Sequence, residues 1–164
     1  MTQIETKRLV LKKPGEKDKQ SLIAQIGDWE VAKWLSRVPH PYTEKDADEW
    51  IQTLSRKELS FCIFDNDILI GGIGLAPQKD GSNQLGFWLG RRHWGRGFTT
   101  EAGKGLLRYA VEELRIGNIA ASYMKGNDAS ARVLEKLGFT ESGEGETYSL
   151  SRKETRPHID LVLP

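Results

Sequence analysis

The chain has 164 residues, of which 38% are hydrophobic and 29% charged, and this length fits one domain, residues 1–164, with a sizeable core. The formal net charge of +1 excludes a global electrostatic preference for nucleic acid or an anionic membrane surface. The single cysteine, Cys62, lies in an apolar run, which excludes an internal disulfide and predicts a small buried side chain rather than a nucleophile.

Nothing in the sequence predicts export or membrane insertion. No apolar stretch approaches the roughly 18 residues of a membrane span. The first eight residues lack the apolar segment of a signal peptide. We therefore expect a cytoplasmic protein with no membrane partner.

The first 60 residues predict one short strand and three helices. Residues 9–11 are apolar and are followed by the breaker Pro14, which predicts the strand. Apolar residues at helical spacing predict helices over residues 22–26, 31–35 and 47–54. Asp28 and Thr43 are suited to cap the second and third helices. The two prolines in residues 39–42 predict a rigid loop between them.

The middle of the chain predicts strands. Residues 61–64 and 68–73 flank a hairpin turn at residues 65–67. The polar segment 76–83 predicts a loop, and residues 85–89 predict the next strand.

The strongest local signal follows that strand, at residues 91–100, which we call the cradle. It combines several arginines, a Gly95-x-Gly97 pair and two threonines at the start of a predicted helix. Glycines allow a tight turn and a close approach of backbone N–H groups to a ligand. A helix N-terminus adds unpaired N–H donors and a positive dipole end. The cradle is therefore suited to a phosphate or pyrophosphate.

The rest of the chain predicts alternating helices and strands. A four-residue apolar spacing predicts a helix from Phe98 to Leu114. A strand over residues 119–124 follows, then a helix that Asn127 or Asp128 caps and that Gly138 ends. The last sheet segments run from 139 to 148 and from 158 to 163. This order predicts a mixed α/β or α+β domain.

Two common phosphate motifs do not match the cradle. A dinucleotide fingerprint requires G-x-G-x-x-G after a first strand, but Thr100 stands where the third glycine belongs. A nucleoside-triphosphate loop requires lysine after its last glycine, but Phe98 follows Gly97. Taken alone, the glycine pair fits an ordinary surface turn equally well.

A wider pattern resembles a known family. Arg92-x-x-Gly95-x-Gly97 resembles the R/Q-x-x-G-x-G/A signature of the GNAT superfamily of acetyl-CoA-dependent N-acetyltransferases. Residues 99–102 resemble its branch of ribosomal-protein N-terminal (alanine) acetyltransferases. Residues 5–9 look like the opening strand of that branch, 85–89 like its fourth strand, and Asn127-x-x-Ser130 with 134–139 like its closing CoA-binding segment.

The resemblance implies a GNAT fold. This is a mixed twisted sheet of about seven strands with flanking helices and a V-shaped gap between strands four and five. The CoA pyrophosphate would bind backbone N–H groups of the cradle, and the pantetheine arm would lie along residues 88–89 in the gap. The implied cofactor contacts are Trp88, Leu89, Arg92, His93, Trp94, Gly95, Arg96, Gly97, Phe98, Thr99, Thr100, Asn127 and Ser130. Arg91 fits either this site or a solvated surface, and Asn127 fits a helix cap as well.

The implied reaction is direct attack of a primary amine on the thioester of acetyl-CoA. A lysine-like amine with a pKa of about 10.4 is neutral in only about one molecule in a thousand near pH 7.4, whereas an α-amine of pKa about 7.7 to 8.0 starts about a quarter neutral. By resemblance Ser130 is the candidate acid near the sulfur, with Tyr123 and Tyr148 as alternatives. Backbone N–H groups near Leu89 would polarise the carbonyl.

The general base is not evident from the sequence. Many members of the family that the chain resembles carry a glutamate two residues before the glycine of the fourth strand, where this chain has Gln84, which cannot accept a proton at physiological pH. His40, in a Pro-His-Pro loop, is an alternative base, although lone histidines are more often structural. His93 belongs to the cradle and His158 to the last strand. Glu30, Asp46 and Glu49 fit solvated helix faces best.

The sequence leaves three functions open. The leading one is an acetyltransferase whose acceptor is a protein N-terminus or a small amine. The second is a CoA-binding domain without turnover, acting as a sensor or assembly part. The third is a phosphate-binding module that contacts RNA, which the near-neutral charge disfavours. We expect no metal and no nucleic-acid partner, and a homodimer stays open.

Overall fold

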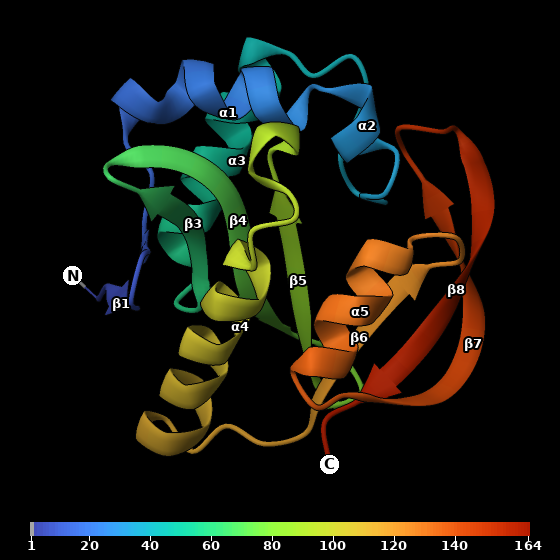
Figure 1. The fold of residues 1–164 in the computed structure, drawn as a ribbon. Coiled ribbons are helices and arrows are strands. Elements are labelled where there is room, and N and C mark those ends of the chain that lie inside the picture. The colour runs from blue at the N-terminus through green and yellow to red at the C-terminus, as the bar shows by residue number, and fades with distance from the viewer. Residues whose placement is uncertain (1) are drawn as a thin grey trace.

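A twisted sheet with helices on both faces organises the protein in a computed structural model that describes residues 2–164 (Figure 1). The strands are β1 (Ile4–Glu5), β2 (Val10–Lys12), β3 (Ser60–Asp65), β4 (Ile68–Pro77), β5 (Asn83–Leu89), β6 (Ile119–Met124), β7 (Thr140–Ser149) and β8 (Glu154–Val162). The α-helices are α1 (Lys19–Ile26), α2 (Trp29–Ala32), α3 (Glu44–Arg56), α4 (Phe98–Arg108) and α5 (Asp128–Lys136). Short 3₁₀ turns cover Glu16–Asp18 and Arg91–His93.

The order of the strands is β1-β2-β3-β4-β5-β6-β8-β7. All neighbours are antiparallel except β5 and β6, which are parallel and pair only between Asn83–Leu85 and Ile119–Ala121. Beyond that point the two strands separate. We call the separated ends, residues 86–89 of β5 and 122–124 of β6, the splay. The V-shaped gap expected from the resemblance is this feature.

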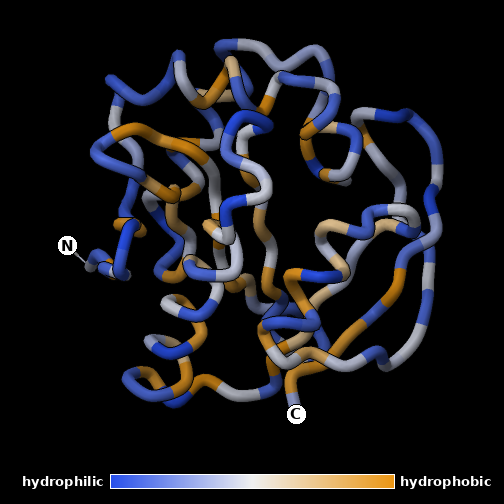
Figure 2. Tube along the Cα trace, viewed as in Figure 1, coloured by the Kyte–Doolittle hydropathy of each residue, from blue (hydrophilic) through white to orange (hydrophobic). Residues whose placement is uncertain are grey.

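Two hydrophobic cores lie on opposite faces of the sheet. In Figure 1, α4 and α5 lie on the near face and α3 on the far face. The larger core joins α4 and α5 to alternate residues of the central strands. The second core joins α1, α2 and α3 to residues of β3, β4 and β5. Figure 2 shows that short hydrophobic and hydrophilic stretches alternate along α4, as expected of a helix with one buried face.

Several local predictions are confirmed. Asp28 caps α2 by accepting a bond from the Glu30 N–H at 3.0 Å. Thr43 caps α3 in a capping box. Asn66 and Asp67 have positive φ and form the two-residue turn between β3 and β4. Within residues 2–164, no helix is long and apolar enough to span a bilayer.

The structure corrects some boundaries. Residues 5–9 do not form the opening strand, because Thr6 to Leu9 make a turn in which the Thr6 N–H donates to the Leu9 carbonyl at 2.9 Å. Strands β1 and β2 flank that turn, so the sheet has eight strands and the splay falls between β5 and β6.

Two predicted loops are shorter than expected, and one predicted helix ends early. Strand β4 continues to Pro77 because its pairing with β5 extends to Asn83. Strand β8 starts at Glu154 because it pairs with β7 up to the hairpin turn. Helix α4 ends at Arg108, and the chain then follows a π-helix over Tyr109–Glu113.

The turn between β7 and β8 docks on the segment that contains α2. The Leu150 N–H donates to the Ser36 carbonyl at 2.9 Å, and the Ser151 hydroxyl donates to the Ala32 carbonyl at 2.9 Å. Arg152 Nε donates to the Lys33 carbonyl at 2.8 Å. The C-terminal hairpin is therefore fixed to the N-terminal helices.

Candidate functional site

The cradle connects the end of β5 to the start of α4. The Gly90 N–H donates to the Ile70 carbonyl at 2.8 Å, which holds the end of β5 against β4. Gly95 and Gly97 have φ of +75° and +76°. This left-handed region costs little only for glycine, so the turn depends on both residues.

The cradle presents a row of unpaired donors. In the part of the chain that the structure describes, no backbone N–H of residues 95–100 donates to a protein acceptor. The first helical bond runs from the Glu101 N–H to the Gly97 carbonyl at 3.0 Å. These donors lie at the N-terminus of α4, which is the positive end of the helix dipole, and such a position favours the binding of an anion.

Arg8 braces the cradle from the turn between β1 and β2. Its Nε donates to Glu101 at 2.7 Å and its Nη1 donates to the Arg96 carbonyl at 3.0 Å. Its guanidinium lies 4.5 Å from the centre of the Phe98 ring, and the guanidinium of Arg96 lies 4.8 Å from the same ring. The sequence reading used Arg8 only as part of a strand and missed this role.

Glu101 joins these parts together. Its carboxylate accepts bonds from the Thr6 hydroxyl and from the Arg8 N–H and Nε. Burial alone would raise the pKa of Glu101, but the bonds from Thr6 and Arg8 outweigh it and hold that pKa below its ordinary value.

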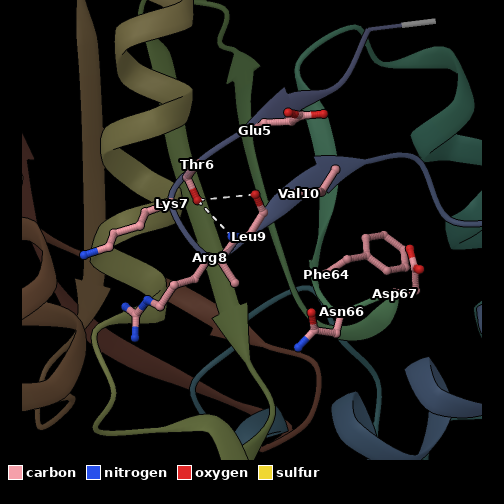
Figure 3. A pocket seen from close by; sticks show the side chains of 9 residues that line it. All are labelled: Glu5, Thr6, Lys7, Arg8, Leu9, Val10, Phe64, Asn66 and Asp67. Carbon is pink, nitrogen blue, oxygen red and sulfur yellow. Dashed lines mark hydrogen bonds between the residues drawn. The ribbon is translucent and has the colours of Figure 1, made fainter.

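A surface pocket of about 250 Å³ lies beside this brace. Figure 3 shows Thr6 bonded to Leu9 within the turn, with Lys7 and Arg8 on the opposite side of the pocket from Phe64. A larger groove of about 760 Å³ runs along α4 from Gly97 and Thr100. The basic side chains that line this groove are Lys7, Lys104, Arg108 and Lys136.

The other polar residues of the cradle are either bonded to neighbouring elements or exposed to solvent. Arg91 makes two bonds to the Asp28 carboxylate, at 2.9 and 2.6 Å, and so ties the cradle to the cap of α2. Arg92 and Arg96 are exposed and can face an anion. Burial, together with nearby Arg96, lowers the pKa of His93. A lowered pKa favours the neutral imidazole at this position.

The exposed edge of β5 continues from the cradle into the splay. The Asn83 N–H donates to Asn118, and strand alternation therefore points the backbone groups of Phe87 and Leu89 toward the β6 side. The Trp94 indole N–H donates to the Leu89 carbonyl at 2.7 Å. The Leu89 N–H is left as a donor in the splay.

Trp88 and Leu89, the two residues of the predicted site that lie on β5, point their side chains to opposite faces of the sheet. Trp88 packs into the second core, with its ring 6.4 Å from that of Trp50, and its backbone lies opposite Gly72 on β4. Leu89 packs on the opposite face against the larger core.

Across the splay, Asn127 and Ser130 come together at the start of α5. Asn127 caps the helix by accepting from the Ser130 N–H at 3.3 Å, and its Nδ2 donates to the Ser130 hydroxyl at 2.9 Å. The Tyr123 hydroxyl instead donates to Glu141 at 3.5 Å. Tyr148 is exposed near the end of β7. Of the three candidate acids, Ser130 is the one whose oxygen is held by a predicted site residue.

The candidate base His40 and the other polar residues of the predicted acceptor side make structural contacts. His40 lies against Trp29, with ring centres 5.0 Å apart. Glu30 pairs with Lys33, and Asp46 completes the capping box of α3. Gln84 Nε2 donates to the Ser122 hydroxyl at 3.0 Å.

Comparison with known proteins identifies the family. A model described as an acetyltransferase (GNAT) domain matches residues 8–140. The chain belongs to the GNAT acetyltransferase family. GNAT acetyltransferases use acetyl-CoA, and this chain is an N-acetyltransferase of that family.

Individual relatives agree. The chain is 30% identical over 160 residues to "Uncharacterized N-acetyltransferase p20" of Bacillus licheniformis, covering 93% of this chain and 90% of that protein. It is 33% identical over 108 residues to the [ribosomal protein uS5]-alanine N-acetyltransferase of Escherichia coli K12, covering 63% and 56%.

Solved structures support the fold. A GNAT-family acetyltransferase from Bacillus anthracis superposes with a TM-score of 0.86 at 21% identity, covering 98% of this chain and 97% of that one. The ribosomal L7/L12 α-N-protein acetyltransferase RimL, in complex with CoA, gives 0.78 at 16% identity, covering 99% and 98%. At these identities the likeness concerns the fold.

Proposed function

We propose that this protein transfers the acetyl group of acetyl-CoA to a primary amine, with the donor held by the cradle and the splay. The observation that carries the proposal is two groups of free backbone donors. One group is formed by residues 95–100 of the cradle, and the other is the open edge of β5 at Phe87 and Leu89. A pyrophosphate joined to an extended amide-bearing arm matches these two groups.

The cradle would bind the pyrophosphate mainly through backbone N–H groups, with Arg92 and Arg96 adding charge. The α4 groove is lined by four basic side chains and by Glu5, Glu101 and Glu113, so it would add little net charge to the binding of phosphate. Phe87 and Leu89 would pair with the pantetheine amides as a neighbouring strand would. Because Trp94 already occupies the Leu89 carbonyl, the Leu89 N–H is the group that can polarise the thioester.

Ser130 would stabilise the departing thiolate. Its oxygen accepts a bond from Asn127 Nδ2, so the hydroxyl proton is free to point elsewhere. A hydroxyl is a weak acid, and its contribution would be a hydrogen bond to the sulfur as the C–S bond breaks. Asn127 would serve both as helix cap and as a ligand of the pantetheine arm.

The acceptor is proposed as a protein N-terminus or a small amine. The E. coli relative is named for acetylating an alanine of a ribosomal protein, which makes an α-amine of this kind a suitable first substrate. An α-amine also needs less help to lose its proton than a lysine-like amine does.

A CoA-release screen tests the proposal. Purified protein and acetyl-CoA are incubated with peptides bearing a free N-terminal alanine, with polyamines and with aminoglycosides, and free thiol is measured. We expect multiple turnovers with at least one class. CoA binding by calorimetry without release from any amine would favour the second candidate, a CoA-binding domain without turnover, which the replacement of a base by Gln84 supports.

A further inference from the structure

A row of polar side chains crosses four neighbouring strands next to the splay, and we call it the polar row. Gln84 on β5 donates to Ser122 on β6 at 3.0 Å. Ser122 lies opposite Asp160 on β8. His158 Nε2 lies 3.1 Å from Asp160 Oδ1, and its Nδ1 lies 2.7 Å from the Thr147 hydroxyl on β7.

The polar row faces away from α4 and α5. Ile159 and Leu161 on β8 pack against the larger core, as Ala121 does on β6. Successive strand residues point to opposite faces, so Asp160 and Ser122 point to the other side. That is the face on which Trp88 meets the α1–α3 layer. The strand residues of that second core come from β3, β4 and β5, and Asp160 is half-exposed, with 45% of its side chain accessible.

The surroundings of His158 fix its ring. A side chain at Gly145 would place its Cβ 2.7 Å from His158 Nε2, so the imidazole fills the space that glycine leaves. The ring is only 18% exposed, and both of its nitrogens have partners. Opposite Asp160, a bulge between Glu141 and Gly143 interrupts the pairing of β7 with β8. Such bulges change the direction of nearby side chains.

The free oxygen of this group belongs to Asp160. Its Oδ1 faces His158, while Oδ2 makes no hydrogen bond or ion pair within residues 2–164. In the sheet, only β6 lies between its strand and β5. Gln84 on β5 is linked to the same row through Ser122.

We propose that Asp160 is the acceptor-side carboxylate of this enzyme, and that His158 is a positioning residue that orients it. The inference rests on the proposed transfer to an amine. Asp160 would bind the acceptor as an ammonium ion and take one of its protons, leaving a neutral amine. The amine nitrogen then forms the C–N bond with the acetyl carbonyl and the C–S bond breaks. The thiolate takes up the second proton that the nitrogen loses, so the products are an amide, CoA thiol and a protonated Asp160 that returns its proton to water.

The charged neighbours of Asp160 on this face belong mainly to its own strand. His158 contacts Asp160. Arg156 lies on the same face of β8, two residues before His158. From β6 and β7 the row receives Ser122, Gly143 and Thr147, which carry no charge. Lys125 pairs with Glu144 at 2.7 Å, and Glu144 lies opposite Ile159, hence on the other face.

The test compares Asp160→Asn with Glu144→Gln, a nearby exposed carboxylate on the opposite face. The acceptor is whichever amine releases CoA fastest with the wild-type protein in the screen above. We expect Asp160→Asn to lower kcat/KM for the amine about 100-fold at pH 7. The loss should shrink below about tenfold at one pH unit above the pKa of the amine, where the neutral form no longer needs a base. Glu144→Gln should stay within twofold of wild type.

CoA affinity, measured by calorimetry, distinguishes a failure of the role of Asp160 from a failure of the proposed function. Both variants should bind CoA within twofold of wild type. If the wild-type protein transfers acetyl groups and Asp160→Asn matches it, or loses the same factor at every pH, the role of Asp160 is refuted while the proposed function stands. If the wild type binds no CoA, or acetylates no amine, the proposed function itself fails.

A second variant tests the role of His158 and covers the case in which Asp160→Asn does not fold. His158→Gln retains an amide that can bond Asp160, whereas His158→Leu does not. We expect His158→Leu to raise KM for the amine about tenfold and His158→Gln to recover most of that loss, with CoA affinity and the melting temperature equal in the two. Equal activity of the two variants would contradict a positioning role.

Discussion

A negative charge placed at Gly97 tests whether the cradle holds an anion. Gly97 precedes Phe98 at the start of α4 and has φ of +76°. An added Cβ would lie 3.5 Å from Arg8 Nη2, which is ordinary contact, so space is not the obstacle. Asparagine and aspartate both tolerate this backbone region better than other side chains. Comparing Gly97→Asp with Gly97→Asn therefore isolates the charge.

The expected difference follows from Coulomb's law. A carboxylate about 5 Å from a group with about two negative charges is repelled by about 1.7 kcal/mol at an effective dielectric constant of about 80, and by about 3.3 kcal/mol at about 40. Because Gly97 is exposed, this range of dielectric constants is appropriate. At about 1.4 kcal/mol per tenfold change in affinity, Gly97→Asp should bind CoA about 15- to 250-fold more weakly than Gly97→Asn.

Isothermal calorimetry with CoA at low and at high salt measures this difference. Because salt screens the repulsion, the difference in CoA affinity between the two variants should become smaller as the salt concentration rises. Urea unfolding of both proteins checks that they are equally folded. Equal affinities for Gly97→Asp and Gly97→Asn at low salt would show that no anion binds next to this residue.

Three further predictions concern the brace, the acid and the polar row. Because the folded-state pKa of Glu101 lies below its ordinary value, its contribution to stability is present at neutral pH and lost as the pH falls through that pKa. Glu101→Gln should therefore lower the free energy of unfolding by about 1–3 kcal/mol at pH 7 in urea melts. If the difference between wild type and variant were just as large below pH 4, this account would be contradicted. Ser130→Ala should reduce turnover at least tenfold while calorimetry shows CoA affinity within a few-fold. Wild-type turnover would assign the acid elsewhere. Gly145→Ala should displace His158 and raise KM for the amine about as much as His158→Leu does. An unchanged KM would show that the ring need not occupy that space.

The central part of the site could be predicted from the sequence because its signals are local. The turn at Gly95 and Gly97 requires glycine, and the helix after it starts where the apolar spacing begins. Asn127 and Ser130 likewise interact within one helical turn. Interactions of this kind can be predicted because the residues that make them lie close together in the sequence.

The parts that the sequence did not predict depend on contacts between distant segments. Arg8 reaches Glu101 and the Arg96 carbonyl, and no pattern near Arg8 indicates those partners. The polar row depends on the register between β6, β7 and β8, which brings Asp160 opposite Ser122. His158 was interpreted as an ordinary strand residue, since its partner Thr147 lies across a hairpin.

The boundary errors have a related origin. The turn at residues 6–9 contains no glycine or proline and was interpreted as strand. Its shape is held by Thr6 and by the bond between Glu101 and the Arg8 backbone. Strand β4 passes through three glycines that weaken a strand signal, and its length is set by the pairing with β5.

The docking of the β7–β8 turn on the α2 segment makes α2 a shared support. The contacts from Leu150, Ser151 and Arg152 join segments more than 100 positions apart. Asp28, which caps α2, also holds Arg91 of the cradle. A change in α2 therefore reaches the cradle and the hairpin together, whereas a change at Ser151 leaves the contact between Asp28 and Arg91 in place.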